Sequence, residues 1–517
     1  MADDDERATR RAVLGVLMPG FTGVRTPPEW VCRAGADGLA GVVLFAHNTP
    51  TPSDAAALTA GLHAVAPGLI VAIDEEGGDV TRLQARRGSS LPGAWALGAV
   101  GDVALTQAAG AALGRLLWAA GIDLDLAPVL DVASNPLNPV IGTRAFADSP
   151  RQVAAHGGAF VRGLQAGGVA VCGKHFPGHG DTAVDSHLGL PRLDVSSLQL
   201  RQRELTPFVT LAHALDSAML AHLVVPIIGP EPASLEPAAY SLARAIGLTG
   251  PLLTDALDMR AVSDGADIGE ASVRALEAGA DLLCLGTTAD RNDRVLFESA
   301  YDAVTWAVRD GRLSLDRLCA SIARTDALRA ALSARRAGHR APALADAEAE
   351  LEAVGGEAAR RAVRVHPGGV GVPPKLALSA LAALGRASSP GCPQVVDLRT
   401  GVDHARGSTA PHVAEALRAR WPGIEQVPAE GRPTSGRLVV AVTRQPFPGT
   451  AELARLQAWW VDDPSMLVVH TGLPDGFPSL PGGGPGVVWA LGTGRVNAER
   501  AVDALVGLLR DGVGVAA

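Results

Sequence analysis

The segment KHFPGHGDTAVDSH, from Lys174 to His187, holds the densest set of chemically active side chains in this sequence. Three histidines and two aspartates fall within its fourteen residues. These residue types transfer protons near neutral pH and also bind divalent metal ions. The segment therefore predicts a functional site, with acid–base catalysis and metal binding as the two chemistries to compare.

Metal binding is the less favoured chemistry. His175 and His179 are four residues apart, a spacing that chelates a metal when both side chains lie on one face of a helix. Pro177 and Gly178 lie between them and disfavour a helix. The five cysteines are odd in number and form no CxxC pair, which argues against structural zinc and a disulfide framework. We expect no metal and no other cofactor; a metal-dependent barrel hydrolase is the alternative, and chelators would inactivate it.

Acid–base catalysis is favoured by a pair near the end of the segment. Asp185 and His187 are two residues apart, so their side chains point the same way in an extended loop. A carboxylate beside an imidazole orients it and raises its pKa, which produces a general acid for neutral pH. Asp255, in the sequence LTDALDM, would then be a carboxylate nucleophile. This is the arrangement of a retaining glycosidase, although spacing alone leaves it one candidate among several.

The elements that must position these residues are eight short apolar runs separated by helix-length amphipathic stretches. This alternation predicts a (β/α)8 barrel of the TIM type. The runs are Val13–Met18, Gly41–Phe45, Leu69–Ile73, Ile122–Ala127, Val169–Cys172, Ala218–Ala221, Pro251–Leu253 and Asp281–Leu285.

Ionisable side chains stand at the ends of five of these runs, where a barrel active site needs them. They are Asp74, Asp131, Lys174 with His175, His222, and Asp255. Lys174 is one of only two lysines among 45 basic residues, which suggests that a compact ammonium group is required at that strand end.

A second, smaller domain is expected after the barrel. We predict a catalytic barrel at 1–335, a helical or partly flexible linker at 336–361, and an α/β sandwich-like domain at 362–517. The expected strands of this domain are Gln394–Leu398, Leu438–Val442, Met466–His470 and Val487–Ala490.

Composition restricts the partners. A hydrophobic content of 47% excludes a disordered chain, and a net charge of −9 with mixed signs argues against nucleic acid and anionic membranes. The segment Thr9–Leu14 loosely resembles a twin-arginine export signal, but the apolar stretch after it ends at Pro19-Gly20 without a cleavage site. We expect a cytoplasmic protein without a membrane span; the oligomeric state is not predicted.

Four segments, in order between residues 10 and 335, resemble glycoside hydrolase family 3 in its bacterial β-N-acetylglucosaminidase (β-N-acetylhexosaminidase) branch. IDEEGG (73–78) is similar to an Asp-x-Glu-Gly-Gly motif, and NPVIGTRAF (138–146) to a Gly-x-Arg-x-Phe motif. The Lys174–His187 loop is the most specific signature, and Leu253–Met259 resembles the nucleophile strand. A barrel followed by an α/β sandwich also occurs in this family.

The resemblance implies a role for each matching residue. Asp255 would be the nucleophile that forms a glycosyl-enzyme, and His187 the general acid/base with Asp185 as its partner. The implied substrate-binding residues are Asp74, Arg144, Lys174 and His175, together with His179 and His222, for which support of the loop or core is the alternative. Asp131 and Asp258 are expected to be structural.

Two residues depart from the family pattern: Glu75 stands in place of Gln, and Asp79 in place of a basic residue. We expect both to make the pocket mouth more acidic and so to alter the leaving-group preference.

The implied activity is release of terminal β-linked N-acetylglucosamine from cell-wall or chitin-derived oligosaccharides. A phosphorylase on the same residues is the first alternative, because a neutral His187 repels phosphate less than a carboxylate would. A non-catalytic sugar-binding protein is the second, although binding alone requires no nucleophile. The expected partner is a small oligosaccharide, with phosphate as an additional acceptor in the first alternative.

Overall fold

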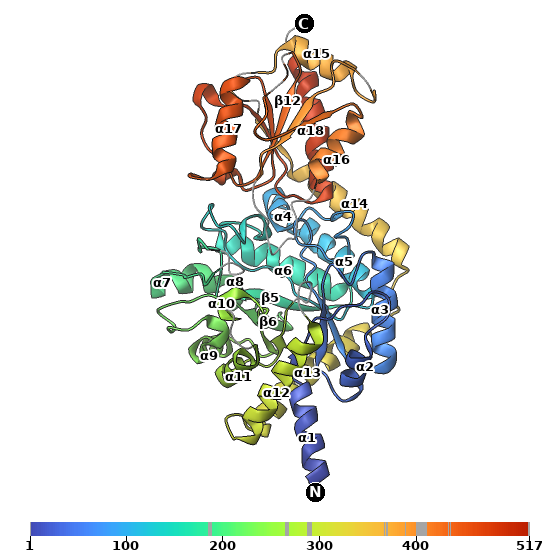
Figure 1. The fold of residues 1–517 in the computed structure, drawn as a ribbon, viewed down its shortest axis with the longest axis vertical. Helices are drawn as coiled ribbons and strands as arrows, with labels where there is room; N and C mark the ends of the chain where they lie inside the picture. The colour runs from blue at the N-terminus through green and yellow to red at the C-terminus, as the bar shows by residue number, and fades with distance from the viewer. Residues whose placement is uncertain are drawn as a thin grey trace.

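The protein consists of two lobes stacked along its long axis (Figure 1). The N-terminus lies at the free end of one lobe and the C-terminus at the free end of the other. The computed structural model describes residues 2–184, 189–263, 268–286, 292–366, 368, 371–387, 389–399, 411–432, 434 and 436–514.

The first lobe contains eight parallel strands, and each predicted apolar run overlaps one of them. Strands β2 to β7 form a parallel sheet in chain order, and β1 pairs with β8. The strands are β1 Leu17–Met18, β2 Gly41–Leu44, β3 Ile70–Ile73, β4 Leu124–Asp125, β5 Ala170–Phe176, β6 Ser217–Leu220, β7 Leu252–Thr254 and β8 Leu283–Cys284. The first run is shortened because Val13 and Leu14 belong to helix α1, Ala2–Leu14.

Hydrogen bonds beside the short strands close this sheet into a barrel. The Val43 N–H donates to the carbonyl of Pro19 at 3.0 Å, which connects β2 to the end of β1. The Thr254 N–H donates to the carbonyl of Leu282 at 3.1 Å, which connects β7 to β8. Every residue of the eight strands is buried, as expected for strands covered on both faces. The predicted (β/α)8 barrel is confirmed.

Helices surround the barrel and present their apolar sides to it (Figure 1). They include α2 Glu29–Ala36, α3 Pro52–Val65, α4 Ala94–Val100, α5 Val103–Ala119, α6 Pro150–Ala166, α8 Leu205–Leu211, α9 Pro237–Ala245, α11 Ile268–Ala278, α12 Asp293–Arg309 and α13 Leu315–Arg336. None of the helices in the described part of the chain is long and apolar enough to cross a membrane.

The second lobe is a smaller α/β unit, as predicted. Its sheet has the order β11-β10-β12-β13-β14-β9, and β9 alone among these strands runs antiparallel. The strands are β9 Arg364–His366, β10 Gln394–Asp397, β11 Glu425–Val427, β12 Val439–Thr443, β13 Leu467–His470 and β14 Gly486–Trp489. The edge strands β9 and β11 are missing from the prediction because their residues are mostly exposed and form no apolar run.

Helices cover both faces of this second sheet. Side chains of α15 Pro374–Ala382, α16 His412–Arg420 and α18 Arg495–Gly514 pack on one face. Side chains of α17 Ala451–Asp462 pack on the other. Two small apolar cores on opposite sides of one mostly parallel sheet define a doubly wound arrangement.

Helix α14, Leu344–Ala362, runs along the junction of the lobes. It packs against α5 and α4 of the barrel and against α18 of the second lobe. Its residues fall within the segment 336–361, for which a helical or partly flexible linker is expected. The domain boundaries at 335 and 361 stay a prediction.

Candidate active site

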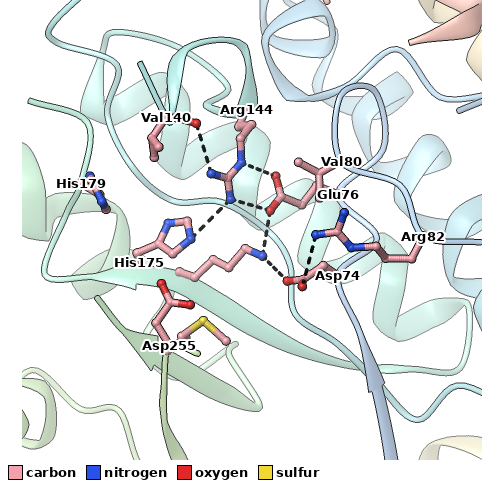
Figure 2. A pocket seen from close by; sticks show the side chains of 11 residues that line it. Asp74, Glu76, Val80, Arg82, Val140, Arg144, His175, His179 and Asp255 are labelled. Carbon is pink, nitrogen blue, oxygen red and sulfur yellow. Dashed lines mark hydrogen bonds and ion pairs between the residues drawn. The ribbon is translucent and has the colours of Figure 1, made fainter. Parts of the chain in front are cut away.

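A polar pocket lies at the C-terminal ends of the barrel strands (Figure 2). This is the end at which barrel enzymes hold their catalytic residues. Its lining residues are Asp74, Glu76, Val80, Arg82, Val140, Arg144, Lys174, His175, His179, Met219 and Asp255. The fold thus brings together six of the residues singled out from the sequence.

Glu76 is the centre of a buried ionic network in this pocket. Its carboxylate accepts two hydrogen bonds from Arg144, from Nε at 2.9 Å and from Nη2 at 2.8 Å. Lys174 Nζ lies 2.8 Å from Glu76 Oε1 and donates to Asp74 Oδ1 at 2.7 Å. The side chains of Glu76, Arg144 and Lys174 are all less than a tenth exposed, so their charges are weakly screened.

The network keeps Glu76 and Lys174 ionised. Burial alone would raise the pKa of Glu76, but the positive charges of Arg144 and Lys174 outweigh it and hold that pKa well below the usual value. Burial alone would lower the pKa of Lys174, but Asp74 and Glu76 attract its charge and raise that pKa. The pocket therefore presents fixed cationic donors beside carboxylate acceptors, a set that suits the vicinal hydroxyls of a sugar.

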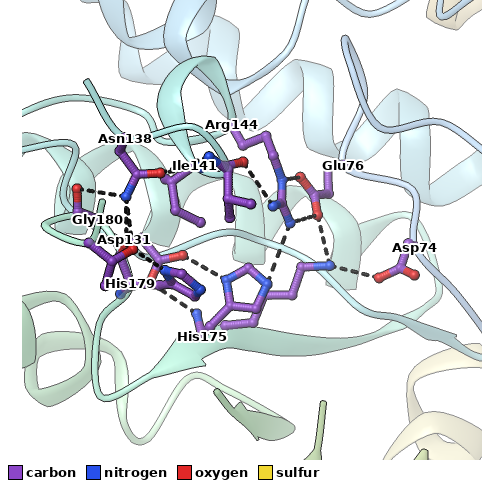
Figure 3. A network of polar contacts seen from close by, with 12 residues as sticks. Asp74, Glu76, Asp131, Asn138, Ile141, Arg144, His175, His179 and Gly180 are labelled. Atoms are coloured by element: carbon purple, nitrogen blue, oxygen red, sulfur yellow. Dashed lines mark hydrogen bonds and ion pairs between the residues drawn. The ribbon is translucent and has the colours of Figure 1, made fainter. Parts of the chain in front are cut away.

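His175 is held in one orientation by Asp131 (Figure 3). Its Nδ1 lies 2.7 Å from Asp131 Oδ2, and its backbone N–H donates to Oδ1 at 3.2 Å. With Nδ1–H directed at the carboxylate, the Nε2 of a neutral ring is left as an acceptor, and it lies 3.4 Å from Arg144 Nη2. Asp131 is fully buried, and the structure gives it the supporting place expected for it.

His179 lies in the same wall and stays neutral. Burial and the nearby His175 together lower its pKa to about 4. Its Nδ1 lies 2.7 Å from Thr182 Oγ1, and its backbone N–H donates to Asp131 at 2.8 Å. Nε2 is buried with no partner among the described residues. Because a buried polar atom without a partner is costly, Nε2 is a candidate for bonding to a ligand.

Asp255 follows β7 and faces the pocket from the side opposite Arg144 (Figure 2). The Ala256 N–H donates to Asp255 Oδ1 at 2.8 Å, while the Ala256 carbonyl lies 2.9 Å from His222 Nε2. His222 Nδ1 lies 2.6 Å from Ser234 Oγ. His222 is not among the lining residues, and both its ring nitrogens are engaged, so this structure places it behind the turn that carries Asp255 rather than on the pocket wall.

The Lys174–His187 loop is described as far as Val184. Within that part, Asn138 Nδ2 donates to the carbonyls of His179 and Gly180, at 2.9 and 3.1 Å. Arg203 Nη2 donates to Asp181 Oδ2 at 2.5 Å. Asp185 and His187, the expected acid–base pair, lie outside the described residues.

Comparison with known proteins decides the family. The model of the glycosyl hydrolase family 3 N-terminal domain matches residues 25–328, which is more than half of the chain. The chain belongs to glycosyl hydrolase family 3. This confirms the family predicted from the motifs and the predicted enzyme class, a glycoside hydrolase.

Curated relatives within family 3 identify the branch. The chain is 34% identical over 333 residues to beta-hexosaminidase A of Pseudoalteromonas piscicida, an alignment of 59% of this chain and 56% of the relative. It is 36% identical over 275 residues to beta-hexosaminidase of Pseudomonas aeruginosa, covering 52% of this chain and 79% of the relative. The chain thus spans little more than half the length of the first of these two proteins.

Solved structures agree over both lobes. A family 3 beta-N-acetylglucosaminidase from Paenibacillus sp. FPU-7 superposes with a TM-score of 0.79 at 27% identity, over 96% of each chain. A beta-glucoside phosphorylase, BglX, superposes with a TM-score of 0.74 at 18% identity over 96% of this chain and 92% of that one. The second likeness shows a shared fold.

The two residues that depart from the family pattern do not make the pocket mouth acidic, contrary to expectation. Glu75 is 1% exposed and faces away from the cavity, where its Oε2 accepts from the N–H groups of Arg82 and Leu83 at 2.7 and 2.9 Å. Asp79 points out of the barrel and bonds to the second lobe. Both carboxylates accept hydrogen bonds from other groups of the protein, so neither is placed to contact a leaving group.

Glu75 should make stability depend on pH, because burial raises its pKa to about 7 from a usual value of 4.5. The folded state then binds more protons than the unfolded state between these values, so this carboxyl costs stability as pH rises through them. Glu75→Gln keeps an acceptor for both N–H groups and removes the charge. We expect it to raise the free energy of unfolding by about 1–3 kcal/mol at pH 8 and to change it little below pH 4.5. Urea unfolding of both proteins across this range measures the difference, and a difference independent of pH would contradict it.

Two charged members of the pocket are absent from the set predicted from the sequence. Glu76 belongs to the IDEEGG motif, but Glu75 precedes it directly. The sequence does not indicate which of these two glutamates faces the cavity. Both lie beyond β3, which ends at Ile73, and only their partners separate them: Glu76 bonds to Arg144, and Glu75 to backbone N–H groups. Arg82 Nη2 lies 3.8 Å from Asp74 Oδ2, and its position in a loop far from any strand end gave no indication of this.

The predicted preference for acid–base chemistry over metal binding concerns the same pocket. Over the described ranges, no three His, Cys, Asp or Glu side chains are grouped in a way that would hold a metal ion. His175 and His179 are both in the wall, but their rings meet edge to face at a centroid distance of 5.9 Å. His175 has one nitrogen on Asp131 and the other beside the cationic Arg144, a poor setting for a metal ligand.

Proposed function

We propose that this chain is a retaining β-N-acetylglucosaminidase that uses Asp255 as its nucleophile. The observation that carries the proposal is the shared pocket, in which the Asp255 carboxylate faces the ionic network of Asp74, Glu76, Arg144 and Lys174. The network supplies hydroxyl-binding groups for one sugar ring, and Asp255 supplies a carboxylate beside it. A retaining glycosidase needs both in one cavity.

The reaction proceeds in two displacements. A carboxylate oxygen of Asp255 attacks the anomeric carbon and forms a glycosyl ester, while His187 donates its proton to the glycosidic oxygen as the bond to the leaving group breaks. Neutral His187 then takes a proton from water, whose oxygen attacks the anomeric carbon and releases Asp255. Asp185 orients the His187 imidazole; both assignments rest on the motif alone.

Substrate binding falls to the residues that line the innermost part of the pocket. Asp74 accepts from sugar hydroxyls, and Lys174 and Arg144 donate to them. His175 offers Nε2, and the buried Nε2 of His179 is the remaining polar group in that wall. His222 supports the Asp255 turn through the Ala256 carbonyl.

The substrate class that we propose is supported by the names of the relatives, beta-hexosaminidase and beta-N-acetylglucosaminidase. We propose that terminal β-linked N-acetylglucosamine is removed from cell-wall or chitin-derived oligosaccharides, and that the enzyme acts in the cytoplasm, as in recycling of cell-wall fragments.

Turnover of a chromogenic β-N-acetylglucosaminide, in phosphate and in a phosphate-free buffer, tests the proposal. We expect free N-acetylglucosamine at the same rate in both buffers. Sugar 1-phosphate, formed at a rate that rises with phosphate concentration, would instead identify a phosphorylase on the same residues. Absence of turnover with this and other β-glycosides would favour a sugar-binding protein.

Removal of the acid should depend on the leaving group. His187→Ala should lower kcat/KM for an unactivated disaccharide by roughly 10²–10⁴-fold, since such a leaving group needs its proton during bond cleavage. The same variant should retain the first step with an activated aryl glycoside, whose phenolate leaves unprotonated. Steady-state kinetics on both substrates measures the contrast, and equal losses would argue against an acid role.

A further inference from the structure

We propose that the second lobe positions the sugar-binding wall of the barrel pocket, and that Asp79 is the residue that couples them. The proposal rests on the proposed function, because it assumes that Arg144 holds the sugar. Asp79 itself is absent from the pocket lining, so it is a positioning residue that acts through its neighbours.

The wall in question is an irregular loop. Residues 138–144, here called the wall loop, follow β4 and contain only the short 3-10 turn Gly142–Arg144. Two of its side chains, Val140 and Arg144, line the pocket. On the inner side, Asn138 Oδ1 accepts from the N–H groups of Val140 and Ile141 at 2.9 and 2.8 Å. A loop of this kind depends on tertiary contacts to hold one conformation.

Asp79 joins the outer side of the wall loop to the second lobe through hydrogen bonds to Thr143 and Thr493, an arrangement here called the clasp. Its Oδ2 accepts from Thr143 Oγ1 at 2.8 Å, and Thr143 directly precedes Arg144. Its Oδ1 accepts from the N–H and the hydroxyl of Thr493 at 2.5 and 2.9 Å. Arg444 Nη2 lies 3.8 Å from Oδ2, and the Asp79 side chain is 3% exposed. One buried carboxylate therefore bonds to both lobes at once.

The backbone before Asp79 restricts the direction in which the Asp79 side chain can point. Gly78 has φ +58°, and a Cβ at this position would lie 2.6 Å from the Cα of Gly93. A Cβ on Gly494, next to Thr493, would lie 3.2 Å from Gly78. The two chains approach backbone to backbone here, which fixes Asp79 between the lobes.

Other residues of the second lobe also contact the wall loop. They come from the C-terminal ends of β12 and β13. Gln445 Nε2 donates to the carbonyl of Pro139 at 3.3 Å. Leu473 packs in one apolar cluster with Val140 and Ile141. In doubly wound sheets this edge usually holds a ligand; in this protein a loop of the barrel occupies it.

The consequence concerns substrate binding. Arg144 makes two parallel bonds to Glu76, and bonds of this kind tolerate small displacements poorly. Loss of the clasp should make the wall loop more mobile and lower the affinity of the pocket for the sugar. The loss of affinity should be as large in the ground state as in the transition state. Such a loss raises KM and leaves kcat nearly unchanged.

Thr143→Val tests the clasp with a side chain of nearly the same shape that lacks the hydroxyl. We expect KM to rise about fivefold or more, kcat to stay within about twofold, and the change to be equal for aryl and oligosaccharide substrates. Thr143→Ser restores the hydroxyl and should return KM to within about twofold of the wild type. Asp79→Ala removes both halves of the clasp and should raise KM further. Glu352→Gln is the matched control, because Glu352 bonds to Arg495 across the same junction without touching the wall loop.

Hydrogen–deuterium exchange of the peptide that contains residues 138–144 gives a readout independent of activity. Faster exchange in Thr143→Val, with Thr143→Ser and Glu352→Gln unchanged, would support the clasp. This result would stand even if the wild type hydrolysed none of the tested glycosides, because the lack of hydrolysis would contradict only the proposed function. Unchanged KM and unchanged exchange in Thr143→Val would overturn the clasp, whether or not Tm falls.

Discussion

Asp255→Ala should lower kcat on an aryl β-N-acetylglucosaminide by roughly 10⁴-fold or more, since removal of a covalent nucleophile leaves only the binding and polarising groups of the site. The ionic network is held by bonds that Glu76 makes to Arg144 and Lys174 and by the bond from Lys174 to Asp74. The variant should therefore still bind the product sugar. Stopped assays at high enzyme concentration, with calorimetric titration of N-acetylglucosamine, measure the two properties separately.

A small anion provides the decisive control for Asp255. Azide that enters the space vacated in Asp255→Ala can attack the anomeric carbon directly, and a single displacement inverts the β-glycoside to an α-glycosyl azide. Recovery of activity with azide, and α product by NMR, would support Asp255 as the nucleophile. Asp326→Asn, an exposed aspartate on α13, is the matched substitution that should leave kcat unchanged. Near-normal turnover in Asp255→Ala would remove the assignment.

Glu76→Gln should have the second largest effect. Glu76 neutralises Arg144 and Lys174 together while almost fully buried, and its replacement removes the one carboxylate that pairs with both of these buried cations. Breaking a buried ion pair on one side costs about 3–5 kcal/mol of stability. Both sugar-binding cations should also move, so we expect kcat/KM to fall by roughly 10²-fold or more.

An exposed ion pair gives the comparison for this prediction. Arg294 and Glu298 pair at 2.7 Å on the surface of α12, with about half of each side chain exposed. Glu298→Gln should change stability by less than about 1 kcal/mol, because water screens such a pair. Denaturant unfolding and kinetics of both variants test the contrast. A Glu76→Gln protein as stable and active as Glu298→Gln would contradict the central place of Glu76.

Much of the fold was predictable because its signals are local. Each barrel strand is buried on both faces, so each leaves an apolar run, and the helix-length spacing between runs is set by the crossover that parallel strands require. Edge strands such as Arg364–His366 and Glu425–Val427 leave no such run and were not predicted.

The candidate site was predictable only in part, for a related reason. Lys174, His175 and Asp74 stand at strand ends, and the end of a barrel strand points to one face of the molecule wherever it falls in the chain. His222 also follows a strand, but its ring turns behind the Asp255 turn, where Ser234 and the Ala256 carbonyl satisfy both nitrogens. Position along a strand does not determine which way a side chain turns beyond the strand end.

The sequence by itself determined the barrel, the second α/β unit, the family, and the motifs that hold the proposed nucleophile and sugar-binding residues. The tertiary structure alone decided which carboxylates face the cavity. Of the three acidic residues within positions 75–79, Glu76 bonds to Arg144 and Lys174, Glu75 accepts from backbone N–H groups, and Asp79 bonds to the other lobe. All three carry the same carboxyl group, so only the partners that the fold brings within hydrogen-bonding distance separate a pocket residue from an internal acid and from a residue that joins the two lobes.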